Sequence, residues 1–288
     1  MSTFPCHAAG SAASPGAPFS AGELEKPRRT EDSLKMAGAP EATTIDSLYG
    51  GTVSLRQPAH GYRVNVDALI LAAFAAQGRA AEVAVDLGAG VGGISLGLHH
   101  LKAATRFALV EREASLLALA EENARAAAMQ SQPFCCDLSS GLPKELRQTA
   151  DLVVANPPFF EPAHGRQGPH AAKTRARFGE LTPFVEAAAA AVSGARTRIV
   201  FVYPARELSR FLSSAERASL VPKRLRLVHA DSTSAARVAL IELRRAKAGG
   251  LVVLPPLLEW ASPGVRSHEL TEILAGKVTV DWTATGRK

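Results

Sequence analysis

The sequence predicts an α/β fold with a mostly parallel sheet and helices on both of its faces. Short apolar runs rich in β-branched residues, such as 82–87 and 151–155, alternate with longer stretches of helical periodicity. This alternation is typical of repeated strand–helix–strand units. Near the end of the chain, 223–229 and 237–243 indicate two consecutive strands with no room for a helix between them. A closing hairpin of this kind puts one antiparallel strand into an otherwise parallel sheet.

The composition indicates a large folded unit with a basic character. The chain has 288 residues, of which 47% are hydrophobic, and this is enough for the core of one large α/β domain with an appendage. The formal net charge is +6 and the pI is about 9.5. An excess of positive charge favours a polyanionic partner such as nucleic acid.

The cysteines and the hydrophobic runs indicate in which cellular compartment the protein is expected. Cys6, Cys135 and Cys136 provide neither an even disulfide framework nor the spacing of a metal site, so we expect a reduced setting and no metal. No run approaches the roughly 18 apolar residues that cross a bilayer, and residues 1–20 lack the pattern of a signal peptide. We expect a cytoplasmic monomer with no membrane partner and no obligate protein partner.

Changes in composition predict four segments. Residues 1–41 are rich in Ala, Gly, Ser and Pro and predict a disordered N-terminal tail. Residues 42–80 predict a hairpin and a helix that form a lid, and residues 81–248 predict the main α/β domain. Residues 249–288 follow as a C-terminal extension with no telling pattern of catalytic residue types.

A glycine-rich turn follows the first predicted strand of the main domain. Asp86 lies near the end of the run 82–87, and Gly88, Ala89 and Gly90 come next. Glycine allows a tight turn and lets the backbone approach a ligand that a Cβ would block. A dinucleotide site would use similar residues, but the spacing here departs from Gly-x-Gly-x-x-Gly at its last position.

Acidic residues end the next two predicted strands. Glu111 closes the run 106–111, where a carboxylate can accept both ribose hydroxyls of a nucleoside. The alternative is that Glu111 stabilises the start of a predicted helix over 114–129. Asp137 ends the third strand and, as one alternative, caps the turn 138–141.

The strongest motif is Asn156-Pro157-Pro158-Phe159, directly after the apolar run 151–155. The two prolines end the strand and hold an amide and an aromatic ring at its carboxyl end. In open α/β sheets, ligands bind at that edge. We therefore expect this motif and the glycine turn to form two halves of one site.

A basic segment follows this motif. Residues 162–179 contain no acid, and their basic and histidine side chains are His164, Arg166, His170, Lys173, Arg175 and Arg177. Such a run is often only a solvated face. Its position directly after the predicted site favours contacts with nucleic-acid phosphates, which would involve Arg166, Lys173, Arg175 and Arg177.

The lid segment contributes a third group of candidates. Asn65 or Asp67 is predicted to be the N-cap of an apolar helix that contains Leu69. Tyr62, Arg63 and Asp67 then have two interpretations, which are packing within a lid and contact with a ligand.

Taken together, these motifs resemble one family. Gln57-Pro58, Gly61-Tyr62-Arg63, the run 67–73, the turn 86–90 and the Asn-Pro-Pro-Phe motif resemble the bacterial enzymes that methylate N6 of the adenine next to the anticodon of valine transfer RNA. The resemblance spans roughly residues 45–274. It implies a class I methyltransferase (Rossmann-like) fold with a seven-stranded sheet, S-adenosylmethionine as methyl donor and tRNA as substrate.

The resemblance also implies roles for individual residues. The expected cofactor contacts are Tyr62, Arg63, Asp67, Asp86, Gly88, Ala89, Gly90, Glu111, Asp137 and Asn156, with Asp137 on the adenine amino group. The expected catalytic residues are Asn156, Pro157, Pro158 and Phe159. Phe159 departs from the Tyr that is frequent in this family and is also common among guanine-N2 methyltransferases of ribosomal RNA. Guanine N2 and the amide of a protein glutamine therefore stay open as targets, and a noncatalytic RNA-binding module is the alternative outside the enzymes.

Overall fold

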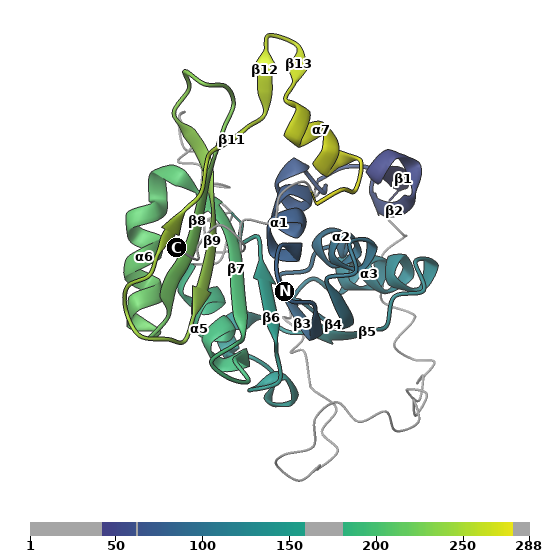
Figure 1. Ribbon diagram of the computed structural model, residues 1–288. Coiled ribbons are helices and arrows are strands. Elements are labelled where there is room, and N and C mark those ends of the chain that lie inside the picture. The colour runs from purple at the N-terminus through teal and green to yellow at the C-terminus, as the bar shows by residue number, and fades with distance from the viewer. Residues whose placement is uncertain (1–41, 62, 159–180, 279–288) are drawn as a thin grey trace, which may run out of the picture.

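The computed structural model describes residues 42–61, 63–158 and 181–278. A central sheet separates two layers of helices (Figure 1). One face carries α1 (Val66–Ala76), α2 (Gly93–His100), α3 (Ala114–Ala126) and α7 (His268–Leu274), and the other carries α5 (Leu181–Ala191) and α6 (Leu208–Arg217). The predicted α/β fold with helices on both faces is confirmed.

The sheet has nine strands within the described residues, and seven of them are long. In spatial order the sheet contains β10 (Val252–Val253), β8 (Val221–His229), β9 (Ala236–Arg244), β7 (Arg198–Pro204), β6 (Leu152–Ala155), β3 (Ala81–Leu87), β4 (Ala104–Glu111) and β5 (Ser131–Cys135). The ninth strand, β11 (Leu257–Leu258), also pairs with β8. Strand β9 runs antiparallel between β7 and β8, as the closing hairpin predicts. The two-residue strands β10 and β11 were not predicted.

Burial on both faces explains why the central strands are continuous apolar runs. All four residues of β6 are buried, since α5 packs on one side of the sheet and α1 on the other. A strand covered on both faces has no solvent side and therefore shows no alternation of polar and apolar residues. This environment fixes the carboxyl ends of β3, β4 and β6 on a rigid support.

The segment before α1 forms a small second sheet. Strands β1 (Thr43–Leu48) and β2 (Val53–Pro58) pair antiparallel around the short helix η2 (Tyr49–Gly51). The side chain of Asn65 accepts a hydrogen bond from the Ala68 amide at 3.4 Å, so Asn65 is the N-cap of α1. The structure thus selects Asn65 over Asp67 as the cap.

The C-terminal extension returns to the carboxyl edge of the sheet. Leu257–Leu258 pair with Val228–His229, and the amides of Glu259 and Trp260 continue the bonding with the carbonyls of His229 and Ala230. The hairpin of β12 (Trp260–Ser262) and β13 (Val265–Arg266) follows, and α7 packs on α1. The remaining short helices are η3 (Leu138–Ser140), η4 (Lys144–Leu146) and η5 (Ala205–Glu207).

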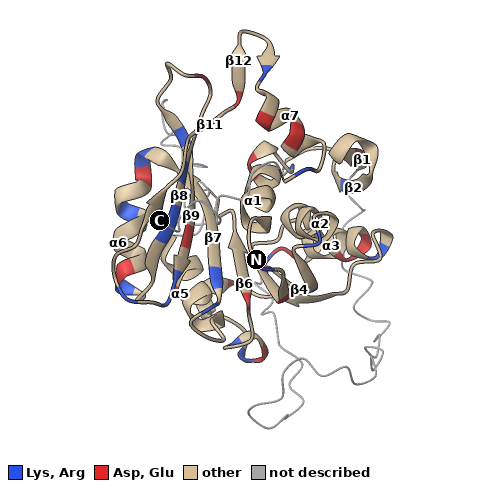
Figure 2. Ribbon diagram, in the orientation of Figure 1, with Lys and Arg blue, Asp and Glu red and all other residues tan. Residues whose placement is uncertain are grey.

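Charge is distributed unevenly over these elements. Lysine and arginine gather on β8 and α6 (Figure 2). Both arginines of β8 are nevertheless buried. Arg224 pairs with Glu242 at 3.1 Å, and Arg226 pairs with Glu269 at 2.7 Å. In the described ranges, no helix is long and apolar enough to cross a bilayer. The predicted tail at 1–41 lies outside these ranges, and the predicted division into four segments stays a prediction.

Candidate active site

The predicted motifs meet at one edge of the sheet. In the order β6, β3, β4 and β5, Leu87 pairs with both Ala155 and Val110, and Glu111 pairs with Cys135. The residues that follow these positions therefore emerge side by side from four adjacent strands. Three strand spacings span about 14 Å. The glycine turn, the Asn-Pro-Pro segment and the two strand-end acids share this edge.

The glycine turn is shaped by positive backbone angles and by a close aromatic ring. Gly88 has φ +72°, and a Cβ there would lie 2.9 Å from the ring of Phe184 in α5. Gly90 has φ +56°, and the neighbouring Ala89 is buried. Glycine is the residue that adopts these angles without strain. The backbone is consequently bare where a ligand would approach the carboxyl end of β3.

Glu111 is already oriented by the turn. Its Oε2 accepts the Gly90 amide at 2.9 Å, and its Oε1 accepts the Glu113 amide at 3.0 Å just before α3. The second contact agrees with the alternative that Glu111 stabilises the start of the helix. The first contact fixes the carboxylate beside the turn, and the predicted ribose contact stays a prediction.

Asp86 is a buried acid with one unsatisfied oxygen. Its Oδ2 accepts the Ser95 hydroxyl at 2.7 Å, whereas Oδ1 is buried without a hydrogen-bond partner among the described residues. Burial raises the pKa of Asp86 to about 7, the charge of Glu111 adds to the rise and the hydrogen bonds from Ser95 oppose it. A buried acceptor in this state fits a cationic or hydrogen-bond-donating group of a ligand.

The Asn-Pro-Pro segment follows β6 directly. Asn156 is partly exposed, Pro157 is buried and Pro158 is exposed. The register of Leu87 with Ala155 puts Asn156 level with Gly88 across two paired strands. An amide and the bare turn are thus neighbours at the site.

Asp137 lies at the far end of the same edge. It is the N-cap of η3, and its Oδ1 accepts the Ser139 amide at 2.9 Å. This hydrogen bond is the main cause of the lowered pKa of Asp137. The structure therefore contains the capping role that the sequence allowed, and the predicted adenine contact stays a prediction.

Arg63 and Asp67 are engaged in contacts between elements. Arg63 forms an ion pair with Asp46 and donates to the Pro58 carbonyl at 3.0 Å, which ties β1 and β2 to the start of α1. Asp67 is 2% exposed and pairs with Arg237 of β9 at 2.6 Å. The packing interpretation describes these contacts, and a cofactor role for either residue stays a prediction.

Several supporting residues escaped the sequence analysis. Ser95 reaches Asp86 from α2, and Phe184 reaches the glycine turn from α5. Asn123 of α3 accepts the Arg56 amide at 2.7 Å and donates to the Val91 carbonyl at 2.9 Å, so it joins β2 to the glycine turn. A serine or asparagine within a helix gives no local signal of such a contact.

Other predicted site residues lie outside the described ranges, and they are Tyr62, Phe159, Arg166, Lys173, Arg175 and Arg177. Within those ranges, no group of three or more His, Cys, Asp or Glu side chains is arranged to hold a metal ion.

Known proteins share this architecture and part of this sequence. Residues 65–173 match the family model of the methyltransferase small domain. A tRNA1(Val) (adenine(37)-N6)-methyltransferase from Flavobacterium psychrophilum is 26% identical over 199 residues, which are 67% of this chain and 83% of the relative.

Solved structures show the same fold at lower identity. A predicted O-methyltransferase from Agrobacterium tumefaciens has a TM-score of 0.55 at 18% identity, and the match covers 73% of this chain and 95% of that one. The T. thermophilus 16S rRNA N2 G1207 methyltransferase, in complex with AdoMet and guanosine, has a TM-score of 0.50 at 18% identity, with 73% and 52% covered.

The strand order and the glycine turn at the carboxyl edge define a class I methyltransferase fold, and the chain is a methyltransferase. This class agrees with the methyltransferase small domain model that residues 65–173 match. The resemblance to the tRNA(Val) adenine-N6 methyltransferases that the sequence motifs indicate is confirmed by the relative from F. psychrophilum.

Proposed function

We propose that this methyltransferase uses S-adenosylmethionine to methylate N6 of an adenine in tRNA, at the position next to the anticodon of tRNA(Val). The observation that carries the proposal is the Asn156-Pro157 pair at the end of β6, next to the glycine turn that follows β3. The activity in the name of the F. psychrophilum relative supports the choice of base and RNA.

The chemistry of an exocyclic amine explains why an asparagine and a proline suffice. The lone pair of such an amine is delocalised into the ring, so the amine is a poor nucleophile until its N–H groups are held. The Asn156 side-chain oxygen and the Pro157 carbonyl can each accept one N–H, which directs the lone pair and stabilises the positive charge that develops. When bound, S-adenosylmethionine supplies a methyl group activated by its sulfonium. No strong base is required.

The cofactor would lie along the edge formed by β3, β4 and β5. The unsatisfied Asp86 Oδ1 offers an acceptor to its ammonium group, and the bare backbone of Gly88, Ala89 and Gly90 allows close approach. Glu111 would accept the ribose hydroxyls and Asp137 the adenine amino group. Tyr62, Arg63, Asp67 and Asn156 complete the proposed cofactor contacts, with no metal ion.

The RNA would be held on the basic segment after the motif. Arg166, Lys173, Arg175 and Arg177 would contact phosphates, which position a nucleic acid without reading its sequence. Phe159 would stack on the extruded base, a contact worth about 1–3 kcal/mol. We propose that the enzyme acts as a cytoplasmic monomer without a protein partner.

Methyl transfer to RNA tests this proposal. Labelled S-adenosylmethionine and total small RNA from a strain that lacks the gene should give N6-methyladenosine in tRNA(Val). Asn156→Ala should lower the turnover about 100-fold or more, because one preorganised partner of the developing charge is lost. Cofactor binding, measured by titration, should fall far less than the turnover, because the other proposed cofactor contacts are kept. Gln132→Ala, which removes an exposed amide on β5, is the matched control and should keep the wild-type rate.

The products separate the proposal from its alternatives. N2-methylguanosine in the labelled RNA would keep the mechanism and replace the substrate. Label on a protein glutamine would reject RNA as the acceptor. Near-normal turnover of Asn156→Ala with intact cofactor binding would reject the catalytic role of Asn156.

A further inference from the structure

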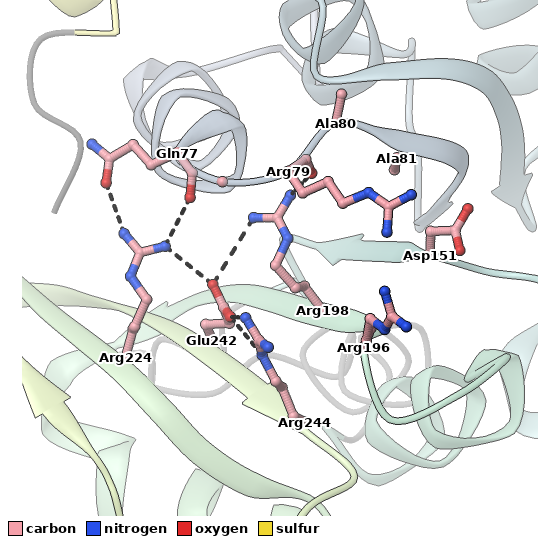
Figure 3. Close-up of a pocket in the computed structure, with 11 residues that line it drawn as sticks. Gln77, Arg79, Ala80, Ala81, Asp151, Arg196, Arg198, Arg224, Glu242 and Arg244 are labelled. Atoms are coloured by element: carbon pink, nitrogen blue, oxygen red, sulfur yellow. Dashed lines mark hydrogen bonds and ion pairs between the residues drawn. The ribbon is translucent and has the colours of Figure 1, made fainter. Parts of the chain in front are cut away.

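A second concave site lies at the opposite edge of the sheet. A cavity of about 430 Å³ opens where β3, β6 and β7 begin, close to the end of α1. It is lined by Gln77, Gly78, Arg79, Ala80, Ala81, Asp151, Arg196, Arg198, Arg224, Glu242 and Arg244, which are drawn in Figure 3. We call this cavity the arginine pocket. Its volume falls in the range of small-molecule sites.

Two buried arginines form the floor of the arginine pocket. Arg198 donates to the carbonyls of Ala75 at 2.8 Å and Arg79 at 3.0 Å. Arg224 donates to the Gln77 carbonyl at 3.1 Å and to its side-chain oxygen at 2.7 Å. These contacts satisfy carbonyls at the C-terminal end of α1, where cations are stabilising.

One buried carboxylate serves three guanidinium groups. Glu242 meets Arg224 at 3.1 Å and Arg244 at 2.8 Å, and it lies 4.0 Å from Arg198 (Figure 3). Burial lowers the pKa of Arg198. The negative charge of Glu242 raises this pKa, and the positive charges of Arg224 and Arg244 lower it. The positive charge on this floor is therefore only partly neutralised.

Two further arginines stand at the mouth with free guanidinium groups. Arg79 and Arg196 are exposed and have no hydrogen-bond or carboxylate partner among the residues that the structure describes. The second carboxylate of the lining, Asp151, accepts the amides of Glu82 at 3.1 Å and Val83 at 3.2 Å. The lining thus carries five guanidinium groups and two carboxylates, of which Glu242 is shared by three of the arginines and Asp151 accepts two backbone amides through Oδ2.

Hydrogen bonds to the end of α1 explain the positions of Arg198 and Arg224 on the floor. They do not explain the two arginines at the mouth of the pocket. Arg198 and Arg224 would form these hydrogen bonds with a closed surface above them. The bonds require neither a cavity of about 430 Å³ nor the two free arginines at its rim. Guanidinium groups that converge without carboxylate partners are suited to phosphate, which accepts two parallel N–H bonds from each.

We propose that the arginine pocket binds a phosphate group, carried by an RNA backbone or by a free nucleotide, with Arg79 and Arg196 as direct contacts. Arg198 and Arg224 on the floor, together with Arg244, add positive potential to the pocket. This site is separate from the Asn156 edge, and its test requires no methyl transfer.

Calorimetric titration of the full chain with inorganic phosphate tests the proposal. The double variant Arg79→Gln/Arg196→Gln should lose at least about tenfold in affinity, because two charge-assisted contacts are removed. The control Arg125→Gln/Arg266→Gln removes the same charge from two other exposed positions and should bind phosphate within about twofold of the wild type. All four side chains are exposed, so thermal unfolding should be unchanged in both variants.

Two further probes identify the source of the phosphate. If the double variant also weakens binding of a single-stranded RNA oligonucleotide, the pocket takes the RNA backbone. If it weakens adenosine monophosphate and leaves the RNA unaffected, the pocket takes a free nucleotide. Failure of the wild type to bind phosphate, or an equal loss in the control variant, would overturn the proposal.

Discussion

Two buried carboxylates at opposite edges of the sheet share their exposure and differ in their partners. Asp86 and Glu242 are each 1% exposed. Asp86 accepts the Ser95 hydroxyl on one oxygen and has no hydrogen-bond partner on the other among the described residues, whereas Glu242 lies among Arg198, Arg224 and Arg244. Burial therefore raises the pKa of Asp86, whereas Glu242 lies at the centre of a cluster of cations.

Asp86 and Glu242 show that burial alone does not determine what a carboxylate does in the structure. A buried carboxylate without a cation costs free energy when it ionises, so it is a position that a ligand can complete. A buried carboxylate with guanidinium partners fixes the elements that carry them. Asp86 lies beside the glycine turn at the carboxyl end of β3, and Glu242 joins β9 to β7, β8 and, through the arginines, to α1.

Replacement of Glu242 should have the largest effect on stability. Glu242→Gln keeps the shape and removes the charge, which leaves Arg198, Arg224 and Arg244 without a carboxylate partner. We expect the free energy of unfolding to fall by about 3–5 kcal/mol, the usual cost of breaking a buried ion pair. Chemical denaturation of the wild type and the variant measures it.

A second substitution shows whether repulsion is the cause. Arg244 is the least buried of the three arginines around Glu242. In the double variant Glu242→Gln/Arg244→Gln, one of the three like charges is gone. Part of the lost stability should therefore return, by about 1 kcal/mol or more. A further loss would mean that packing dominates at this position.

Asp86 should give an effect that depends on pH. Its pKa is about 7 in the folded chain and about 4 when unfolded, so the folded state holds the proton more tightly. This contribution to stability is complete below about pH 4 and is lost as the pH rises to about 7, with a slope of at most about 1.4 kcal/mol per pH unit. Denaturation curves between these limits should show the slope in the wild type and a flatter profile in Asp86→Asn.

Cofactor binding extends this comparison of pH profiles. An ammonium group beside Oδ1 would favour the ionised form of Asp86 and lower its pKa. Saturation with S-adenosylmethionine should then flatten the wild-type profile and leave that of Asp86→Asn unchanged. A wild-type profile that keeps its slope at saturation would remove Asp86 from the proposed cofactor contacts.

The carboxyl edge could be predicted from sequence because its signals are local. The central parts of β3, β4 and β6 are buried and form apolar runs, and the polar residues of the site lie at the ends of these strands or directly after them. Asp86, Glu111 and Asn156 are of this kind. The positions of Ser95 and Phe184 depend on how α2 and α5 pack, and the sequence contains no local sign of that packing.

The amino edge could not be predicted because its partners are distant in the chain. Arg224 and Glu242 are 18 residues apart and meet across two paired strands, and Arg224 reaches the Gln77 carbonyl over 147 residues. In sequence, these arginines look like solvated charges on alternating strands. The two-residue strands β10 and β11 were missed for a related reason, since pairing with the edge of β8 defines them rather than any periodicity.

An exposed ion pair at the same amino edge should show the smallest effect. Glu82 meets Arg106 at 2.7 Å, but the Glu82 side chain is 71% exposed. We expect Glu82→Ala to cost less than about 1 kcal/mol, because water already solvates the carboxylate and salt screens the attraction. Denaturation at low and high salt should show a small loss that shrinks with salt, whereas the loss in Glu242→Gln should depend little on salt. Equal losses of stability in Glu82→Ala and Glu242→Gln would mean that burial does not determine how much an ion pair stabilises this fold. Asp86 and Glu242 would then differ only in the number of their partners.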